Sequence, residues 1–492
     1  MKTRVLFRQP GSSVRERRAL VFMLALRASV LSFAFLFPSS IFADKIVLRE
    51  TIDREIKAAW AKEKLTAPER STDPVFLRRV YLDLVGMIPT YEETTAFLAD
   101  TDPKKREKLI DRLLTDPRYA LHQAQTWDVN LLGRNPKGIR STNRDAFRTW
   151  LATQFEQNIP YDRIVHKLLR AEEDNSKLFY VAYRNSDDLT TATMRFFLGT
   201  QLQCAKCHDH PYEDWKQKDY YGMAGFFVRT FVVEADGETE HVKKFYVGEK
   251  STGNVNFKAT PKDAKPGTKG EPGKPRFLSG PELQEPELPK DFKEPKVVQK
   301  KAPPKPLFSR REKVVEWITA KDKPYLARAA VNRIWAQFMG RGIVHPVDDF
   351  NSDNEPSHPE LLKAIESEFI THQFDLKWLI REIVNSEAYQ VTDVGTVTDE
   401  MPKYYERART RPLSVEELTA SLHIATGLGV ESARNSKPSD HMVKYLGEPT
   451  DGRGRFQGSL TERLFVHNGD VFRRLCHPRD GNLPQRLLTS QK

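Results

Sequence analysis

The feature that most constrains the fold of this chain is a repeated marker for the start of a helix. Asp73-Pro74, Asp102-Pro103 and Asp116-Pro117 each stand directly before a stretch with an apolar helical face. Aspartate is a good N-cap, and proline suits the first helical position because its missing N–H would have no helical partner there. The pattern T-x-x-E at Thr90 to Glu93 adds a capping box. These markers predict a mainly α chain built from short, separately capped helices.

The apolar spacing agrees with this prediction. One apolar stripe is formed by residues at steps of four, namely Leu48, Ile52, Ile56 and Trp60. Gly86 and Gly340 stand where two predicted helices would close. A second capping box, S-x-x-E, runs from Ser414 to Glu417. Helical patterns therefore occupy both halves of the chain.

A change in composition divides the helical patterns into two groups. Residues 257–309 are dense in proline, lysine and glycine, which predicts a linker or an extended surface strap that buries no core. Just before it, residues 232–256 are rich in β-formers and predict a few short strands. We therefore expect two helical domains, at 44–256 and 310–492, joined by this segment.

The first 43 residues have the three parts of a secretory signal. Arginines open the segment, an apolar stretch follows, and small residues precede Ala43 at a plausible cleavage position. Arg27 lies inside the apolar stretch and argues against a membrane anchor, because a charge at the bilayer centre costs about 2.5–3.5 kcal/mol. No other apolar run is long enough to span a bilayer. We expect a periplasmic or secreted protein that has no integral membrane domain after residues 1–43 are removed.

The charge balance bears on the class of partner. The formal net charge is +11, but the first 43 residues hold seven basic residues against one acidic residue. More than half of the excess would therefore leave with the signal peptide. The mildly basic remainder, without a zinc-finger, RNP or P-loop pattern, predicts no nucleic-acid partner.

The chemistry of the chain is concentrated in LQCAKCHDHP, residues 202–211. Cys204 and Cys207 are three apart, and His208 follows directly. In a C-x-x-C-H site the two thiols reach the two vinyl groups of a porphyrin, and the adjacent histidine lies under the iron. The sequence therefore predicts a haem c site, placed at the C-terminal end of the predicted helix DLTTATMRFFLGTQLQC. Met223 is a candidate sixth ligand, since a thioether is a soft donor.

Two other readings of the same residues stay open. Cys204, Cys207 and either His208 or His210 would supply three ligands to zinc, with a nearby aspartate or a distant histidine as the fourth. A plain disulfide between the two cysteines is the other possibility. With three cysteines in 492 residues, the chain has no disulfide framework.

A second group of polar residues lies in HPVDDFNSDNEPSHPE. Its carboxylates and imidazoles could bind a metal or carry out acid–base chemistry, but an ordered loop that caps the next helix is the simpler interpretation. The residues concerned are His345, Asp348, Asp349, Asp353 and His358. The chain contains no G-x-S-x-G, H-E-x-x-H or dinucleotide fingerprint. The sequence therefore does not identify an enzyme class.

Long segments of the chain resemble a known architecture. FFLGTQLQCAKCHDHPYEDWKQKDYYGMAGFF and DPVFLRRVYLDLVGMIPTYEETTAFLAD resemble the cytochrome-like domain of a secreted, two-domain family of planctomycete type. KPYLARAAVNRIWAQFMGRGIVHPVDDFNSDNEPSHPELLKAIESEFITHQFDLKWLIREIVNSEAYQ resembles the second domain of that family. Both domains are of unknown function, so the resemblance implies an architecture more than an activity.

Three functions follow as expectations. The first is an extracytoplasmic, c-type-cytochrome-like protein that binds haem c and transfers electrons to an unidentified redox partner. The second is a non-redox secreted binding or scaffold protein whose cysteines and histidines hold a structural metal or form a disulfide. The third, prompted only by the family resemblance, is a hydrolase or other enzyme of polysaccharide breakdown, for which the partner would be an extracellular polymer.

Overall fold

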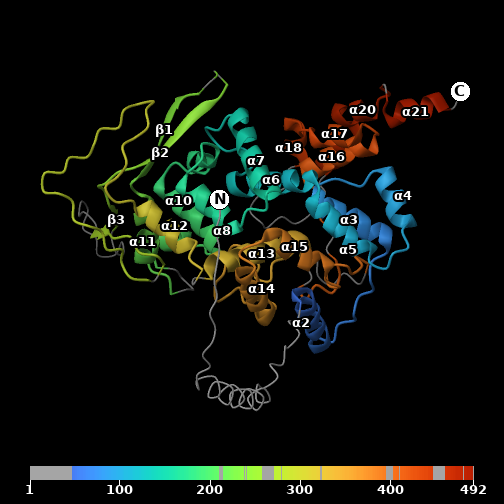
Figure 1. Cartoon of the computed structure of the whole chain (residues 1–492), viewed down its shortest axis with the longest axis horizontal. Helices are drawn as coiled ribbons and strands as arrows, with labels where there is room; N and C mark the ends of the chain where they lie inside the picture. The colour runs from blue at the N-terminus through green and yellow to red at the C-terminus, as the bar shows by residue number, and fades with distance from the viewer. Residues whose placement is uncertain are drawn as a thin grey trace, which may run out of the picture. The chain divides into compact units, whose positions relative to one another are not determined.

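The prediction of a mainly α fold is confirmed (Figure 1). The computed structural model describes residues 47–209, 214–237, 239, 241–257, 271–278, 280–321, 324–394, 403–408, 411–446, 460–479 and 481–490. Leu48–Lys492 forms one compact unit. The predicted signal peptide, residues 1–43, lies outside the described residues.

The helices fall before and after a small β region. Those before it are α2 (Leu48–Lys62), α3 (Asp73–Val85), α4 (Tyr91–Ala99), α5 (Lys105–Thr115), α6 (Pro117–Leu132), α7 (Ser141–Glu156), α8 (Tyr161–Arg170), η1 (Asn175–Lys177), α9 (Leu178–Ala182), α10 (Ser186–Thr193), η2 (Met194–Leu198), η3 (Gln203–Lys206) and α11 (Gln217–Phe227). Those after it are α12 (Arg310–Ile318), α13 (Tyr325–Met339), α14 (Pro359–Thr371), α15 (Leu376–Asn385), α16 (Val415–Ala425), α17 (Gly429–Arg434), α18 (Asp440–Leu446), α19 (Leu460–Asn468), α20 (Asp470–Cys476) and α21 (Leu483–Ser490).

The strands form two small antiparallel pairs in the described residues. β1 (Thr230–Asp236) pairs with β2 (Lys243–Glu249), as the β-formers predicted. β3 (Val255–Phe257) pairs with β4 (Glu271–Gly273), which reaches into the segment predicted as a linker or strap.

The helix starts largely follow the predicted markers. The capping boxes at Thr90 and Ser414 are both formed. Asp116 caps α6, and its side chain accepts a hydrogen bond from the backbone of Arg118. The pair at Asp102 differs, because the Asp102 carboxylate accepts from the Lys104 N–H in a turn and α5 begins after it. Local chemistry therefore set the starts to within a few residues.

The two predicted helical domains share one apolar core. The buried stripe of α2 packs on α14 and α15, so the first helix of one segment lies on helices of the other. At the same junction, Arg49 forms an ion pair with Glu382 at 2.8 Å. Trp60 Nε1 donates a hydrogen bond to the carbonyl of Tyr404 at 2.8 Å. The division into separate folding units stays a prediction.

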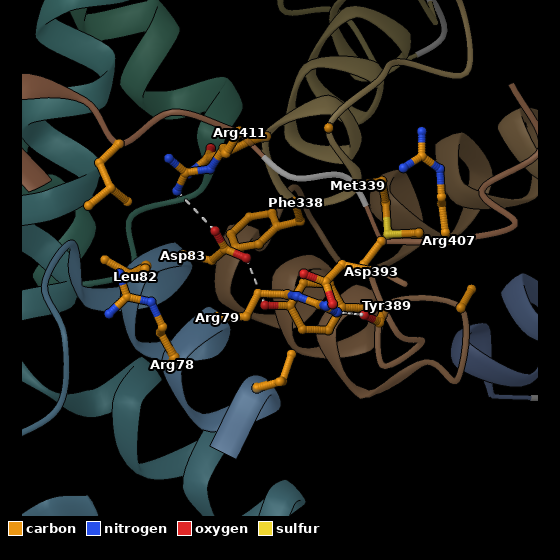
Figure 2. Close-up of a pocket in the computed structure, with 16 residues that line it drawn as sticks. Arg78, Arg79, Leu82, Asp83, Phe338, Met339, Tyr389, Asp393, Arg407 and Arg411 are labelled. Atoms are coloured by element: carbon orange, nitrogen blue, oxygen red, sulfur yellow. Dashed lines mark hydrogen bonds and ion pairs between the residues drawn. The ribbon is translucent and has the colours of Figure 1, made fainter. Parts of the chain in front are cut away.

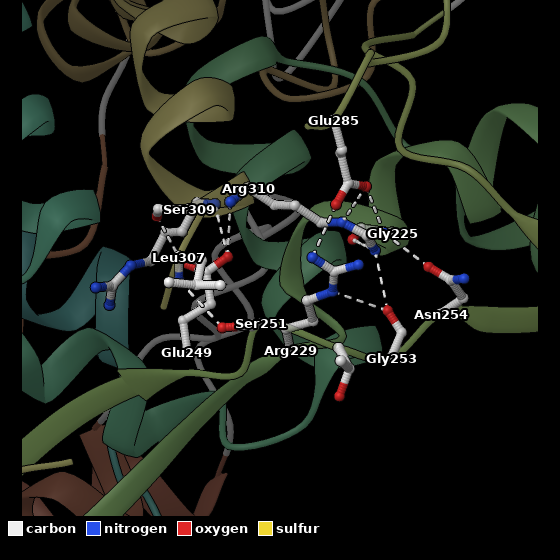
Figure 3. A network of polar contacts seen from close by, with 12 residues as sticks. Gly225, Arg229, Glu249, Ser251, Gly253, Asn254, Glu285, Leu307, Ser309 and Arg310 are labelled. Atoms are coloured by element: carbon white, nitrogen blue, oxygen red, sulfur yellow. Dashed lines mark hydrogen bonds and ion pairs between the residues drawn. The ribbon is translucent and has the colours of Figure 1, made fainter. Parts of the chain in front are cut away.

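The proline-rich segment is fastened to the surface where it is described. Phe277 and Leu278 are buried in the core, so the expectation that this segment buries no core residue is wrong at these two positions. Glu285 accepts hydrogen bonds from Arg229 at 2.8 Å and from Arg310 at 2.7 Å (Figure 3). These contacts tie the segment to the end of α11 and the start of α12.

No helix in the described residues combines the length and the apolar character that a membrane crossing requires.

Candidate functional site

The helix that was expected to deliver Cys204 ends before it. α10 runs into η2, a short π-helix, and Gly199 ends it in the left-handed conformation with φ of 64°. The Gly199 carbonyl accepts a hydrogen bond from the Phe350 N–H at 2.8 Å. A Cβ at position 199 would lie 2.6 Å from Cδ2 of the Phe350 ring. Glycine is therefore required both for the turn and for the close contact with Phe350.

The CxxCH motif lies on the 3₁₀ turn η3 and the residues just after it. Leu202 and Ala205 are 2% and 0% exposed, and they anchor the turn to the core. By contrast, solvent reaches the side chains of Cys204, Cys207 and His208, and both thiols are free. Two side chains thus face the core, while the three predicted ligands remain open to solvent.

The N-terminal part of α11 holds this turn in place. The Lys206 carbonyl, between the two cysteines, accepts hydrogen bonds from Gln217 Nε2 at 3.3 Å and from the Tyr221 hydroxyl at 3.1 Å. The Gln217 N–H donates to the Asp209 carboxylate at 2.9 Å. Lys206 also forms an ion pair with Asp187 at 2.8 Å, and this hydrogen bond raises the pKa of Lys206. The Lys206 carbonyl before Cys207 and the Asp209 side chain after it are therefore both held by α11.

His208 is in a suitable state for metal ligation. Its Nδ1 lies 2.7 Å from the carbonyl oxygen of Asp209. This contact favours the tautomer with the proton on Nδ1, which leaves the lone pair on Nε2. A histidine that binds a metal through Nε2 commonly has its other nitrogen bonded to a carbonyl or carboxylate in this way.

Met223, the predicted sixth ligand, is buried and does not share the exposure of the motif. Met223 is 0% exposed within α11, and its sulfur accepts a hydrogen bond from the Leu278 N–H at 3.3 Å. It is therefore a core residue, whereas the residues of the motif are exposed. His210 lies outside the described residues. The roles of Met223 and His210 as ligands stay predictions.

Within the part of the chain that the structure describes, no three His, Cys, Asp or Glu side chains are grouped where they could hold a metal ion. Residues of the loop before α14 lie in different environments. Asp348 is buried and pairs with Arg195. His358 packs on Tyr404 and Tyr405, and burial, with a smaller effect of Lys403, lowers its pKa to about 4. These two residues of the loop therefore serve packing and ion pairing.

Sequence reasoning missed a buried charge network between the two segments of the chain. Arg411 donates to both carboxylate oxygens of Glu417 at 2.7 Å and to Asp83 at 3.0 Å. The Tyr389 hydroxyl donates to the other oxygen of Asp83 at 2.8 Å (Figure 2). Burial alone would raise the pKa of Glu417, but the Arg411 guanidinium opposes it and lowers that pKa to about 2. The network joins α3 to the segments around α15 and α16.

Residues of this network line two neighbouring cavities. A cavity of about 340 Å³ is lined by Arg78, Arg79 and Arg407, besides Asp83 and Arg411 (Figure 2). A cavity of about 330 Å³ shares Asp83 and Arg411 with it. The second cavity is rich in arginine, and its arginines are Arg134, Arg195, Arg333, Arg341 and Arg411. The sequence holds no local marker for this cluster because its members are far apart along the chain.

Comparison with known families agrees with the order of the two segments. Residues 51–231 match the family model PSCyt2, described as a protein of unknown function (DUF1549). Residues 310–479 match the family model PSD1, also described as a protein of unknown function (DUF1553). No curated protein and no solved structure matches the chain.

Proposed function

We propose that this chain, in which a PSCyt2 domain is followed by a PSD1 domain, is an extracytoplasmic protein that carries haem c at Cys204, Cys207 and His208. One observation carries the proposal. The two thiols and the imidazole are exposed together on a turn whose backbone is fixed by buried neighbours and by α11. A turn that is held in place while its two thiols and its imidazole stay open to solvent leaves all three accessible to a cofactor.

The donor set fits covalent attachment. Each thiol would add its S–H across one vinyl group, forming a carbon–sulfur bond without a leaving group or an external oxidant. Both thiols are free and exposed, as this addition requires. His208 would offer Nε2 to the haem iron. When bound, haem c supplies a one-electron iron couple, and the function of the chain would then be electron transfer.

Export is part of the same proposal, because haem c is attached outside the cytoplasm. The basic, apolar and small-residue order of residues 1–43 supports it. The two features reinforce each other, since a C-x-x-C-H site would be of little use to a chain that stayed in the cytoplasm.

The test is expression in a host that attaches haem c, followed by haem staining of a denaturing gel. We expect the wild-type band to stain and the double variant Cys204→Ala, Cys207→Ala to lose the stain, because thioether bonds survive denaturation. His208→Ala should retain some stain but shift the Soret band, since it removes the proximal nitrogen.

The third cysteine provides the matched control. Cys476 is also free and exposed, and a histidine follows it, but it has no partner cysteine three residues away. Cys476→Ala should stain as strongly as the wild type. A wild-type protein that does not stain but contains stoichiometric zinc would replace the haem proposal with the structural-metal alternative. A colourless, metal-free protein two hydrogens lighter than the reduced chain would instead indicate the disulfide.

A further inference from the structure

The cavity of about 330 Å³ has the size of a site for a small molecule. Its walls come from α3, α6, η2, α13, α16 and the segments that precede α14 and α16. Trp127 and Phe196 supply apolar surface, and charged side chains supply the rest. A cavity with apolar walls and a few convergent charges is the usual form of a ligand site.

Much of the charge in this cavity is already compensated. Arg134 donates to Glu416 at 2.6 Å. Arg411 is held by Glu417 and Asp83 in the network described above. Each of these two arginines therefore already has a carboxylate partner within the protein.

The wall formed by Arg195 and Arg333 is different. Both guanidiniums lie over the ring of Phe196, at 4.6 Å and 5.5 Å from its centroid. Asp348 is the carboxylate that faces them, and its Oδ2 lies 3.1 Å from Arg195 Nε. A second donor, Gln201, already occupies the other oxygen of Asp348 at 3.2 Å. The carboxylate of Asp348, which Gln201 already engages in part, is therefore the counter-charge that faces both Arg195 and Arg333.

Arg333, like Arg195, is only partly satisfied by hydrogen bonds. Its Nη2 donates to the Arg195 carbonyl at 3.3 Å, but its buried Nε makes no hydrogen bond within the described residues. Burial lowers the pKa of Arg333, and the charge of Asp348 offsets this only in part. A buried donor on a charged group is costly to leave unpaired. An anion in the cavity would add a second counter-charge beside the two guanidiniums that line it.

We infer that this cavity binds a small molecule bearing an oxyanion group, held by Arg195 and Arg333 and packed against Trp127 and Phe196. Arginine suits this role because its planar fork matches carboxylate, sulfate and phosphate oxygens. The site is independent of the proposed haem site, since it shares no residue with the CxxCH motif. It nevertheless lies close along the chain, because η2 and Gln201 directly precede the motif.

The experiment is isothermal titration calorimetry of the full chain with sodium sulfate, sodium phosphate and sodium benzoate. Ionic strength is kept constant with sodium chloride, so that general screening does not contribute. We expect saturable binding of at least one of these anions. The anion that binds most tightly indicates whether the natural ligand carries a sulfate, a phosphate or a carboxylate group.

Variants locate the binding. Arg333→Gln and Arg195→Gln should each weaken the affinity by about tenfold or more, because each removes a charged donor. Arg328→Gln is the matched control, since Arg328 lies on the same helix and pairs with Glu366 at 2.8 Å without lining the cavity. It should bind as the wild type does.

Two results would overturn the inference. One is the absence of saturable binding of all three anions to the wild type. The other is an affinity that is unchanged in a folded Arg333→Gln or Arg195→Gln variant, or lowered equally in Arg328→Gln. Circular dichroism checks folding, and Arg333→Lys, which keeps the charge but loses the fork, provides a gentler variant with an expected intermediate affinity.

Discussion

The burial of Leu202 and Ala205 determines which side chains of the CxxCH motif are exposed to solvent. Both side chains are buried, so the turn has a fixed inner side, and Cys204, Cys207 and His208 are left on the outer side. The sequence identified the three outer residues from their spacing. It could not identify the inner anchors, because whether an alanine is buried depends on tertiary packing.

Glu417 supports a prediction about pH at the scale of one residue. Its folded pKa of about 2 lies below the ordinary value of 4.5, so its contribution to stability is complete above pH 4.5. That contribution is lost as the pH falls from 4.5 through about 2, and it amounts to roughly 3 kcal/mol. Urea unfolding of the wild type should therefore show stability falling across this range.

Glu417→Gln should be less stable than the wild type at pH 7 and should lose less stability on acidification. Glu416→Gln, which changes the neighbouring carboxylate paired with Arg134, should keep the wild-type acid dependence. An acid dependence that is identical in the wild type and in Glu417→Gln would show that this pair does not govern acid stability.

At the scale of elements, the end of η2 differs from the prediction for a physical reason. The apolar pattern continues through Leu202, so the sequence predicted one helix up to Cys204. Gly199 ends the helix because its carbonyl pairs with the backbone of Phe350, a residue far away in the sequence. Helix starts were predictable from local capping, whereas this end depends on a partner that no local pattern reveals.

Gly199→Ala tests that explanation. The variant must accept a left-handed backbone and also displace the Phe350 ring, so we expect a loss of about 2–3 kcal/mol. Gly429→Ala is the control, since Gly429 has φ of 84° but open space around its Cβ position. It should lose only about 1 kcal/mol. Equal losses in the two variants, measured by chemical denaturation, would mean that the contact with Phe350 is unimportant.

The strap provides a second prediction at this scale. Glu285 is the carboxylate that Arg229 and Arg310 share, and both arginine side chains are largely buried (Figure 3). Glu285→Ala would leave them without this partner, and we expect a loss of about 2–3 kcal/mol in unfolding free energy. Glu287→Ala, at an exposed position on the same strap, should change stability by less than about 0.5 kcal/mol. A Glu285 variant as stable as the Glu287 variant would show that the network does not fasten the strap.

At the scale of the whole molecule, the shared core bears on how the chain unfolds. α2 packs on α14 and α15, and Asp83 of α3 is bonded to Tyr389 and Arg411. We therefore expect tryptophan fluorescence and far-UV circular dichroism to report one coincident urea transition. Two separated transitions would instead support the prediction, made from the composition of residues 257–309, that the chain has two independent domains.

The fold of the whole chain also shows which features could be predicted from the sequence alone. Fold class, most helix starts and the residues of the motif followed from capping, periodicity and spacing, because these are local properties. The cavity of Arg195 and Arg333 and the network of Arg411 did not, because each gathers residues that are brought together only by packing of distant helices. The charge of an arginine is visible in the sequence, but its partner is not.

Covalent attachment of haem at Cys204 and Cys207 can be decided by measuring the intact mass of the protein. The protein is purified from a haem-attaching host, denatured and weighed. We expect the mass of a chain beginning near Asp44 plus one haem, and the polypeptide mass alone for the double variant Cys204→Ala, Cys207→Ala. A wild-type mass equal to that of the polypeptide alone, from a host shown to load another C-x-x-C-H protein, would contradict it.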